Sequence, residues 1–360
     1  MANNFGKRLN NLRRELASRG LDALIVTHAP DWYYLTGFTG EAGALVVGKG
    51  QCTLITDGRF TTQAKDETSG VRIVKHKEGL FKEVGEFVRR AGMRRVGFDS
   101  GQMTMAQHHA LKKATGSRSA YKSANGVVLA LRTRKDAQEL AQMRKAAILA
   151  SEVVQQAIRL LKPGVRELEI AAEIEFQMRK AGASGAAFES IVAFGERAAL
   201  PHARPSAKRL GKNELVVLDL GAILGHYCSD ITRTVYVGTA PKRVREWYKA
   251  VLEAQTAAIA AVRTGAACGD VDAAARETLA SYKLDKYFVH STGHGLGLEV
   301  HEDPRVARGQ KARLEPGTVI TVEPGIYVPG IGGIRIEDDV AVHEDRSEVL
   351  TRAPREFMEL

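Results

Sequence analysis

The stretch that decides the fold of this chain is Val289-His-Ser-Thr-Gly-His-Gly-Leu-Gly-Leu-Glu-Val-His-Glu302. It holds three of the ten histidines in the sequence, His290, His294 and His301. Its glycines alternate with other residues at the centre of the stretch, which is incompatible with a regular helix. His290 and His294 are therefore not the helical ligand pair of a zincin, a motif that also requires glutamate where Ser291 stands.

A glycine-rich segment that carries imidazoles is typical of a binding loop, because glycine lets the backbone pass close to a ligand. We expect this loop to lead into a strand, with an apolar face formed by Leu296, Leu298 and Val300. An ordinary surface loop with polar histidines is the alternative interpretation. Acidic residues elsewhere in the chain favour the binding loop, since two precede it and two follow it: Asp219, Asp230, Glu323 and Glu337.

Each of these four acids lies in or beside an apolar run that is typical of a strand. The runs are Leu218-Asp-Leu-Gly221, Cys228-Ser-Asp-Ile-Thr-Arg-Thr234, Val322-Glu-Pro-Gly325 and Gly333-Ile-Arg-Ile-Glu337. A buried charge is costly unless it is paired or bound to a metal, and clustered carboxylates repel one another unless cations lie among them. Four carboxylates and an imidazole without thiolates favour two Mn, Co, Fe or Zn ions, and such a pair suits hydrolysis.

At 360 residues the chain is long enough for two domains. In residues 1–125, strand patterns alternate with helical ones, which predicts an α/β domain. Residues 119–126 form a polar stretch ending in glycine, which we interpret as a linker. Residues 126–360 open with two helical patterns, from about Asp136 to Leu161 and from Glu167 to Ala181, and then become rich in strands. We therefore predict a second, α+β domain in which helices lie against a curved antiparallel sheet.

Composition excludes several classes of protein. Hydrophobic residues make up 44% and charged residues 26%, as in ordinary soluble proteins. No apolar run approaches the roughly 20 residues needed to span a bilayer, and the first twenty residues lack the apolar core of a secretory signal. The three cysteines are widely spaced, which favours a reducing compartment over disulfides or a thiolate metal site. We expect a cytoplasmic protein without a membrane partner.

The net charge of +10 is unevenly distributed. Residues 1–130 contain 20 Lys and Arg against 11 Asp and Glu, whereas residues 131–360 contain 32 against 31. A basic first domain is compatible with nucleic-acid binding. Its cations are scattered over helical patterns, however, without aromatic residues interleaved on a strand. We interpret them as a solvated face and expect no nucleic-acid partner.

The order of the five candidate ligands resembles the ligand set of the pita-bread metallopeptidases, which include methionine aminopeptidase, Xaa-Pro aminopeptidase and prolidase, with metal-free creatinase as a relative. Tyr34-Leu-Thr-Gly-Phe38 and Thr56-Asp-Gly-Arg-Phe60 are similar to the creatinase-type N-terminal domain, which methionine aminopeptidases lack. Arg132-Thr-Arg-Lys135 is similar to the segment that opens the catalytic domain. The resemblance covers nearly the whole chain and points to the Xaa-Pro branch.

The resemblance implies a role for each site residue. Asp219 and Asp230 would hold one divalent ion, and Asp230, His294, Glu323 and Glu337 the other, with Asp230 and Glu337 bridging. Manganese is the expected metal, with Co, Zn and Fe as alternatives. The residues implied in catalysis are Glu323 as proton acceptor, His202 near the leaving group and His301 at the tetrahedral intermediate. The residues implied in shaping the substrate pocket are His290, Tyr327 and Arg335. For the histidines the alternative is a structural role.

We therefore expect an Xaa-Pro aminopeptidase that acts on peptides with proline at the second position. A prolidase restricted to Xaa-Pro dipeptides is the alternative. A creatinase-like or binding protein is disfavoured, because creatinase loses the metal ligands that this chain retains. Trp32 follows Pro30-Asp31 in an expected loop, and in related Xaa-Pro peptidases the first domain helps to form dimers. We expect a homodimer in which Trp32 contributes to the substrate cleft.

Overall fold

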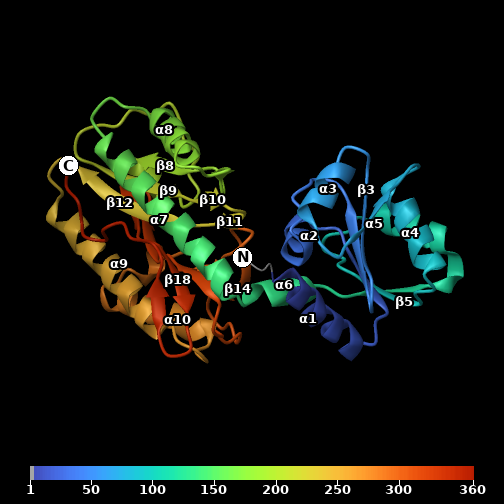
Figure 1. Ribbon diagram of the computed structural model, residues 1–360. Helices are drawn as coiled ribbons and strands as arrows, with labels where there is room; N and C mark the ends of the chain where they lie inside the picture. The colour runs from blue at the N-terminus through green and yellow to red at the C-terminus, as the bar shows by residue number, and fades with distance from the viewer. Residues whose placement is uncertain (1–3) are drawn as a thin grey trace. The chain divides into compact units, whose positions relative to one another are not determined.

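The structure is a computed structural model that describes residues 4–360. The chain divides into two compact units, Met1–Arg132 and Thr133–Leu360 (Figure 1). Helix α6 (Val127–Thr133) lies where the first unit gives way to the second. The expected boundary at residues 125 and 126 falls just before this helix.

The first unit contains a six-stranded mixed sheet in the order β4-β3-β2-β1-β5-β6. Its strands are β1 (Ala23–Val26), β2 (Ala44–Gly48), β3 (Cys52–Thr56), β4 (Arg72–Lys75), β5 (Arg95–Phe98) and β6 (Ala120–Ser123). Strand β2 pairs antiparallel with both β1 and β3. The other pairs, β3 with β4, β1 with β5 and β5 with β6, are parallel. The linker expected at residues 119–126 is wrong in part, because β6 pairs with β5 within it.

Helices pack against this sheet and complete an α/β unit, as predicted. They are α1 (Phe5–Ser18), α2 (Ala29–Thr36), α3 (Thr61–Glu67), α4 (Leu80–Arg90) and α5 (Met105–Thr115), with the short 3-10 helix η1 (Gly116–Arg118). The apolar stripe of α4 enters the core, where Val84 and Val88 join Val46 and Ile55 of the sheet. Thr104 and Gln107 form a capping box that begins α5, because each side chain accepts a hydrogen bond from the other residue's backbone N–H.

Trp32 does not lie in a loop, so that expectation is wrong. Pro30 occupies the first turn of α2, where its missing N–H costs no hydrogen bond, and the helix continues through Thr36. The indole is 3% exposed, and its ring centroid lies 6.2 Å from that of Phe38. Pro30 begins a helix here, whereas the sequence analysis interprets it as a sign of a loop.

Antiparallel ladders join the strands of the second unit. Its strands are β7 (Gly185–Ala186), β8 (Ile191–Phe194), β9 (Glu214–Leu220), β10 (Ala222–Leu224), β11 (Tyr227–Cys228), β12 (Ile231–Val237), β13 (Gly293–Gly295), β14 (Glu302–Val306), β15 (Val319–Val322), β16 (Gly325–Val328), β17 (Gly332–Arg335), β18 (Asp338–Val342) and β19 (Ser347–Val349). The two larger groups have the orders β12-β9-β8 and β14-β13-β15-β18-β19. These ladders and the helices that cover them confirm the predicted α+β fold.

The helices of the second unit form two neighbouring pairs, α7 with α8 and α9 with α10 (Figure 1). Their bounds are α7 (Ala137–Arg159), α8 (Glu167–Lys180), α9 (Lys242–Ala261) and α10 (Cys268–Ser281), with the 3-10 helices η2 (Gly195–Ala199) and η3 (Asp285–Tyr287). A capping box of Asp136 and Glu139 begins α7, and Pro163-Gly164 follows its end. No helix in residues 4–360 is long and apolar enough to cross a bilayer.

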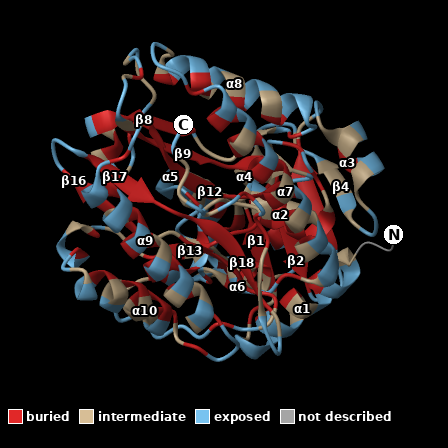
Figure 2. Cartoon of the chain, turned by 90° about the vertical axis from the view of Figure 1, so that its left-hand side faces the viewer, coloured by how far each residue is buried: buried red, intermediate tan, exposed pale blue. Residues whose placement is uncertain are grey.

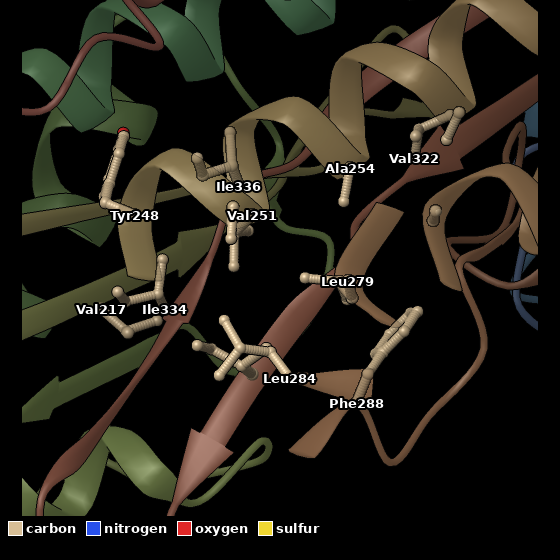
Figure 3. Packing of buried hydrophobic residues seen from close by; sticks show 14 of the residues in the cluster. Val217, Tyr248, Val251, Ala254, Leu279, Leu284, Phe288, Val322, Ile334 and Ile336 are labelled. Atoms are coloured by element: carbon tan, nitrogen blue, oxygen red, sulfur yellow. The ribbon is translucent and has the colours of Figure 1, made fainter. Parts of the chain in front are cut away.

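Alternation along β9 divides the second unit into two apolar cores. Val216 and Leu218 pack with α7 and α8, whereas Leu215 and Val217 join the core under α9 and α10. Figure 3 shows Val251 of α9 and Leu279 of α10 in this second core. Most strand residues are buried, and the outer faces of the helices are exposed (Figure 2). Strands packed in this way are rigid supports for side chains that project from them or from their ends.

The position of Trp32 in the core of the first unit predicts a structural phenotype for Trp32→Ala. Removal of a buried indole should lower the free energy of unfolding by about 3–5 kcal/mol, seen as a lower thermal midpoint. A substrate contact, by contrast, would lower kcat/KM for Xaa-Pro peptides and leave the midpoint unchanged. Light scattering on the same samples tests the expected homodimer.

Candidate metal centre

The first two candidate ligands come from one antiparallel strand pair. Asp219 lies on β9 opposite Thr232 of β12, and Asp230 immediately precedes β12. The pairing of these two strands therefore brings the two aspartates to neighbouring positions. Asp219 shares its face of β9 with Val217, opposite the face that packs with α7 and α8.

The other three candidate ligands come from adjoining strands of the five-stranded group. Glu323 follows β15 and Glu337 precedes β18, and these two strands pair with Val322 opposite Asp338. His294 is the central residue of β13, which pairs with β15. A Cβ at Gly293 would lie 1.9 Å from the Thr321 carbonyl oxygen, so only glycine allows β13 to approach β15 this closely.

The ligand atoms of these residues converge. One ligand atom each from Asp230, His294 and Glu337 lies within 4.8 Å of the other two. Nε2 of His294 lies 3.7 Å from Oδ2 of Asp230 and 3.5 Å from Oε1 of Glu323. Nδ1 of His294 donates to the Gly295 carbonyl at 3.0 Å, which leaves the Nε2 lone pair directed at the carboxylates.

The electrostatics of the cluster are unfavourable for bare carboxylates. Burial raises the pKa of Asp230 and of Glu337 well above the ordinary range, and the neighbouring acids raise both further. Burial also raises the pKa of Glu323 to about 7. Burial lowers the pKa of His294 to about 4, so its imidazole is neutral at physiological pH. The cluster holds protons or cations more readily than isolated carboxylates do.

Two observations show that divalent ions fit this cluster. Oδ1 of Asp219 and Oδ1 of Asp230 are buried without a hydrogen-bond partner in the part of the chain that the structure describes. Ligands on opposite sides of an ion with bonds of about 2.0–2.2 Å are about 4 Å apart, which is close to the spacing of the ligand atoms. A neutral imidazole and several carboxylates form the donor set that borderline divalent metals prefer.

Three supporting residues were missed by the sequence analysis. The Thr232 hydroxyl donates to Oε2 of Glu337 at 2.6 Å, and the Thr321 hydroxyl donates to Oε1 of Glu323 at 3.4 Å. Asp339 accepts the Asp230 N–H at 3.2 Å. In the sequence, each missed residue lies two positions from a predicted ligand. Thr232 lies two positions from Asp230, Thr321 from Glu323 and Asp339 from Glu337. Because residues two apart on a strand share a face, this spacing was the available signal.

A chain of hydrogen bonds links the remaining pocket residues to the ligands. Nδ1 of His290 donates to the Ser291 carbonyl at 2.8 Å, and burial lowers the pKa of His290 to about 4. The neutral ring therefore accepts from the Tyr327 hydroxyl through Nε2 at 2.8 Å. Arg335 in turn donates to the Tyr327 oxygen at 2.7 Å and to Oδ2 of Asp219 at 2.5 Å. The structure thus joins these three predicted residues to a candidate ligand.

The two other predicted histidines lie at the edge of the cluster. The ring of His301 meets that of His294 edge-on, with centroids 4.4 Å apart. His202 is exposed, and its charge lowers the pKa of both His290 and His301. Every site residue predicted in the second unit therefore lies in or beside the cluster, whereas Trp32 belongs to the first unit.

Comparison with known proteins identifies the class of enzyme that carries this arrangement. The sequence pattern of metallopeptidase family M24 matches residues 141–344, and that of the Creatinase/Prolidase N-terminal domain matches residues 8–134. An Xaa-Pro dipeptidase of Pyrococcus furiosus is 36% identical over 353 residues, which cover 98% of this chain and 99% of that protein.

Solved structures give the same result. An Xaa-Pro dipeptidase from Bacillus anthracis has a TM-score of 0.96 and 38% identity, covering 99% of this chain and 100% of the other. An X-Pro aminopeptidase from Thermotoga maritima has a TM-score of 0.90 and 33% identity, covering 96% and 100%. With its pita-bread catalytic unit, the chain is a hydrolase and belongs to metallopeptidase family M24.

Proposed function

We propose that this protein is a two-metal Xaa-Pro dipeptidase that hydrolyses the bond between an N-terminal residue and a C-terminal proline. The observation that carries the proposal is the convergence of Asp230, His294, Glu323 and Glu337 on one cluster. Asp219 is near enough for its charge to raise the pKa of the three carboxyl groups. Dipeptidases of 36% and 38% identity support the dipeptide substrate over the longer peptides first expected. We also propose that the enzyme is a cytoplasmic homodimer.

The five ligands would divide between two divalent ions, of which manganese is the proposed identity. Asp219 and Asp230 would hold one ion, and the other ligands would complete the second, with Asp230 and Glu337 shared. When bound, such ions lower the pKa of water and polarise a carbonyl group. The protein's part is to hold these ligands in place with the threonine hydroxyls and paired strands described above.

The residues around the ligands would position the dipeptide and move protons. Glu323 would accept a proton from the attacking water and pass it toward the leaving proline nitrogen. His301 and His202 would donate hydrogen bonds to oxygen atoms of the substrate, because an imidazole N–H is a hydrogen-bond donor. Proline offers no N–H, so its ring must be recognised by packing and its carboxylate by charge.

A panel of substrates tests the proposed specificity. The metal-reconstituted enzyme should cleave Gly-Pro and other Xaa-Pro dipeptides and leave Xaa-Pro tripeptides and Met-Ala peptides largely intact. Release of free proline and of amino-terminal residues would be followed by chromatography. Equal or faster cleavage of the tripeptides would instead restore the aminopeptidase assignment.

Removal of metal should abolish activity. Exhaustive chelation is expected to eliminate turnover of Gly-Pro, and added Mn²⁺ should restore it, because bound divalent ions are proposed to lower the pKa of the attacking water and to polarise the carbonyl group. Elemental analysis before and after reconstitution measures the number of ions per chain. Full turnover by metal-free protein would contradict the two-metal centre.

Substitutions test the proposed roles of Glu323 and His301. Glu323→Gln and His301→Ala should each lower kcat by roughly 10²-fold or more, since one removes the proposed proton acceptor and the other a hydrogen-bond donor. His301→Ala should keep its full metal content, because His301 is proposed to lie outside the ligand set. Loss of metal from His301→Ala would show that His301 is itself a ligand.

Metal affinity should rise with pH. The pKa of Glu323, raised to about 7 by burial, means that a proton competes with the ion below that pH. Apparent Mn²⁺ affinity at pH 6 is therefore expected to be at least about tenfold weaker than at pH 8. Calorimetry in buffers with different ionisation enthalpies would measure both the affinity and the protons released. Equal affinity at the two pH values, without proton release, would contradict this electrostatic description.

A further inference from the structure

Glu337 lies between two strands and is not part of either strand ladder. Strand β17 ends at Arg335 and β18 begins at Asp338, so Glu337 lies in the break between them. Its N–H donates to the Thr232 carbonyl at 3.2 Å. Among residues 4–360, no backbone N–H of a neighbouring strand donates to its carbonyl. The carbonyl requires another donor, because an unpaired buried carbonyl is costly.

Arg233 supplies that donor from a fully buried position. Its Nη1 donates to the Glu337 carbonyl at 2.6 Å and to the Thr232 carbonyl at 2.9 Å. Its Nη2 donates to Oδ1 of Asp338 at 2.7 Å. The guanidinium therefore binds the Glu337 carbonyl directly. It also binds the Thr232 carbonyl, which accepts the Glu337 N–H. The Thr232 hydroxyl in turn donates to the Glu337 carboxylate.

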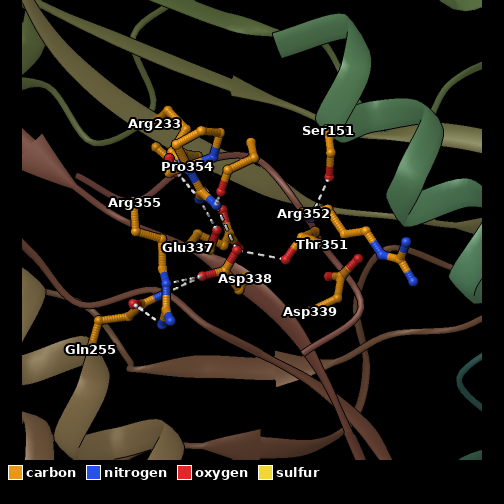
Figure 4. Close-up of polar contacts among 12 residues, drawn as sticks. Ser151, Arg233, Gln255, Glu337, Asp338, Asp339, Thr351, Arg352, Pro354 and Arg355 are labelled. Atoms are coloured by element: carbon orange, nitrogen blue, oxygen red, sulfur yellow. Dashed lines mark hydrogen bonds and ion pairs between the residues drawn. The ribbon is translucent and has the colours of Figure 1, made fainter. Parts of the chain in front are cut away.

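The remaining donors of Arg233 bind the segment Thr351–Arg355. Nη2 donates to the Ala353 carbonyl at 2.7 Å and Nε to the Pro354 carbonyl at 2.8 Å. All five N–H groups of the guanidinium are thus used. Figure 4 shows Arg233 and Asp338 between this segment and Glu337.

Asp338 is in turn fixed by groups from two other elements. Its Oδ1 accepts from the Thr351 hydroxyl at 2.6 Å, and its Oδ2 accepts from Nε2 of Gln255 on α9 at 2.6 Å. Arg233 and Asp338 are each 1% exposed. A buried ion pair whose polar atoms are satisfied in this way holds its members in one geometry.

We propose that Arg233 is a positioning residue for the candidate metal ligand Glu337, and that the segment Thr351–Arg355 is part of the support of the metal centre. The inference rests on the proposed two-metal function. It adds that metal affinity depends on a guanidinium that touches neither the metal nor the substrate. Lysine cannot replace it, because an ammonium has three donors where five carbonyl or carboxylate contacts exist.

The test is Mn²⁺ binding to metal-free protein, measured by calorimetry for the wild type and for Arg233→Lys. Outer-shell substitutions typically weaken metal binding by 10–100-fold, so Arg233→Lys should lose about tenfold or more. Thr351→Val, which removes one hydrogen bond to Asp338, should show a smaller loss in the same direction. This second variant keeps the test valid if Arg233→Lys does not fold.

Ile174→Ala is the matched control, because Ile174 is a buried residue of α8 in the core under α7 and α8. It should lower the thermal midpoint and leave Mn²⁺ affinity unchanged. If folded Arg233→Lys binds Mn²⁺ with wild-type affinity, the inference is overturned but the proposed metal centre is not. If the lysine variant does not fold, the same result for Thr351→Val overturns the inference. Failure of the wild type to bind Mn²⁺ would overturn the proposed function and this inference together.

Discussion

Repulsion among buried carboxylates is the constraint on which the rest of the catalytic unit depends. Asp230, Glu323 and Glu337 are held close together, and burial raises the pKa of each above its ordinary range. For Glu323 the unfolded chain would titrate near 4.5 and the folded chain near 7. The metal-free fold therefore loses stability as pH rises between these values, and bound divalent cations would offset that loss.

The fold meets this constraint by placing the candidate ligands on paired strands or at their ends. The β9 and β12 pair carries Asp219 and Asp230, and β13, β15 and β18 bring in His294, Glu323 and Glu337. Ladder hydrogen bonds resist the separation that charge repulsion would otherwise produce. Where a ligand lies outside a ladder, a buried side chain replaces the missing bonds, as Arg233 does at the carbonyl of Glu337.

Much of this arrangement could be predicted from the sequence because its signals are local. Apolar runs that contain or end at acids predicted the strands, and the glycine-rich stretch excluded a helix around His294. The supporting groups were harder to predict. The partners of Thr232 and Asp339 lie more than 100 residues away in sequence. Thr321 lies two residues from its partner Glu323, but threonine is common in strands and gives no particular signal there. Trp32 was misplaced for the opposite reason, since Pro30 is a local signal with two meanings, a loop or the first turn of a helix.

The choice between dipeptides and longer peptides has a different physical origin from the chemistry at the ligands. The same fold accompanies both a dipeptidase and an aminopeptidase among the similar structures. The two substrates differ at the carboxyl group of proline, which is a free carboxylate in a dipeptide and a neutral amide in a longer peptide. Arg335 is a cation in contact with the candidate ligand Asp219, and Asp219, Tyr327 and Thr232 already accept its hydrogen bonds. Selection for a dipeptide must therefore come from two sources. One is the attraction that remains between Arg335 and the free proline carboxylate, and the other is packing around the proline ring. The identity of the candidate metal ligands determines neither of them.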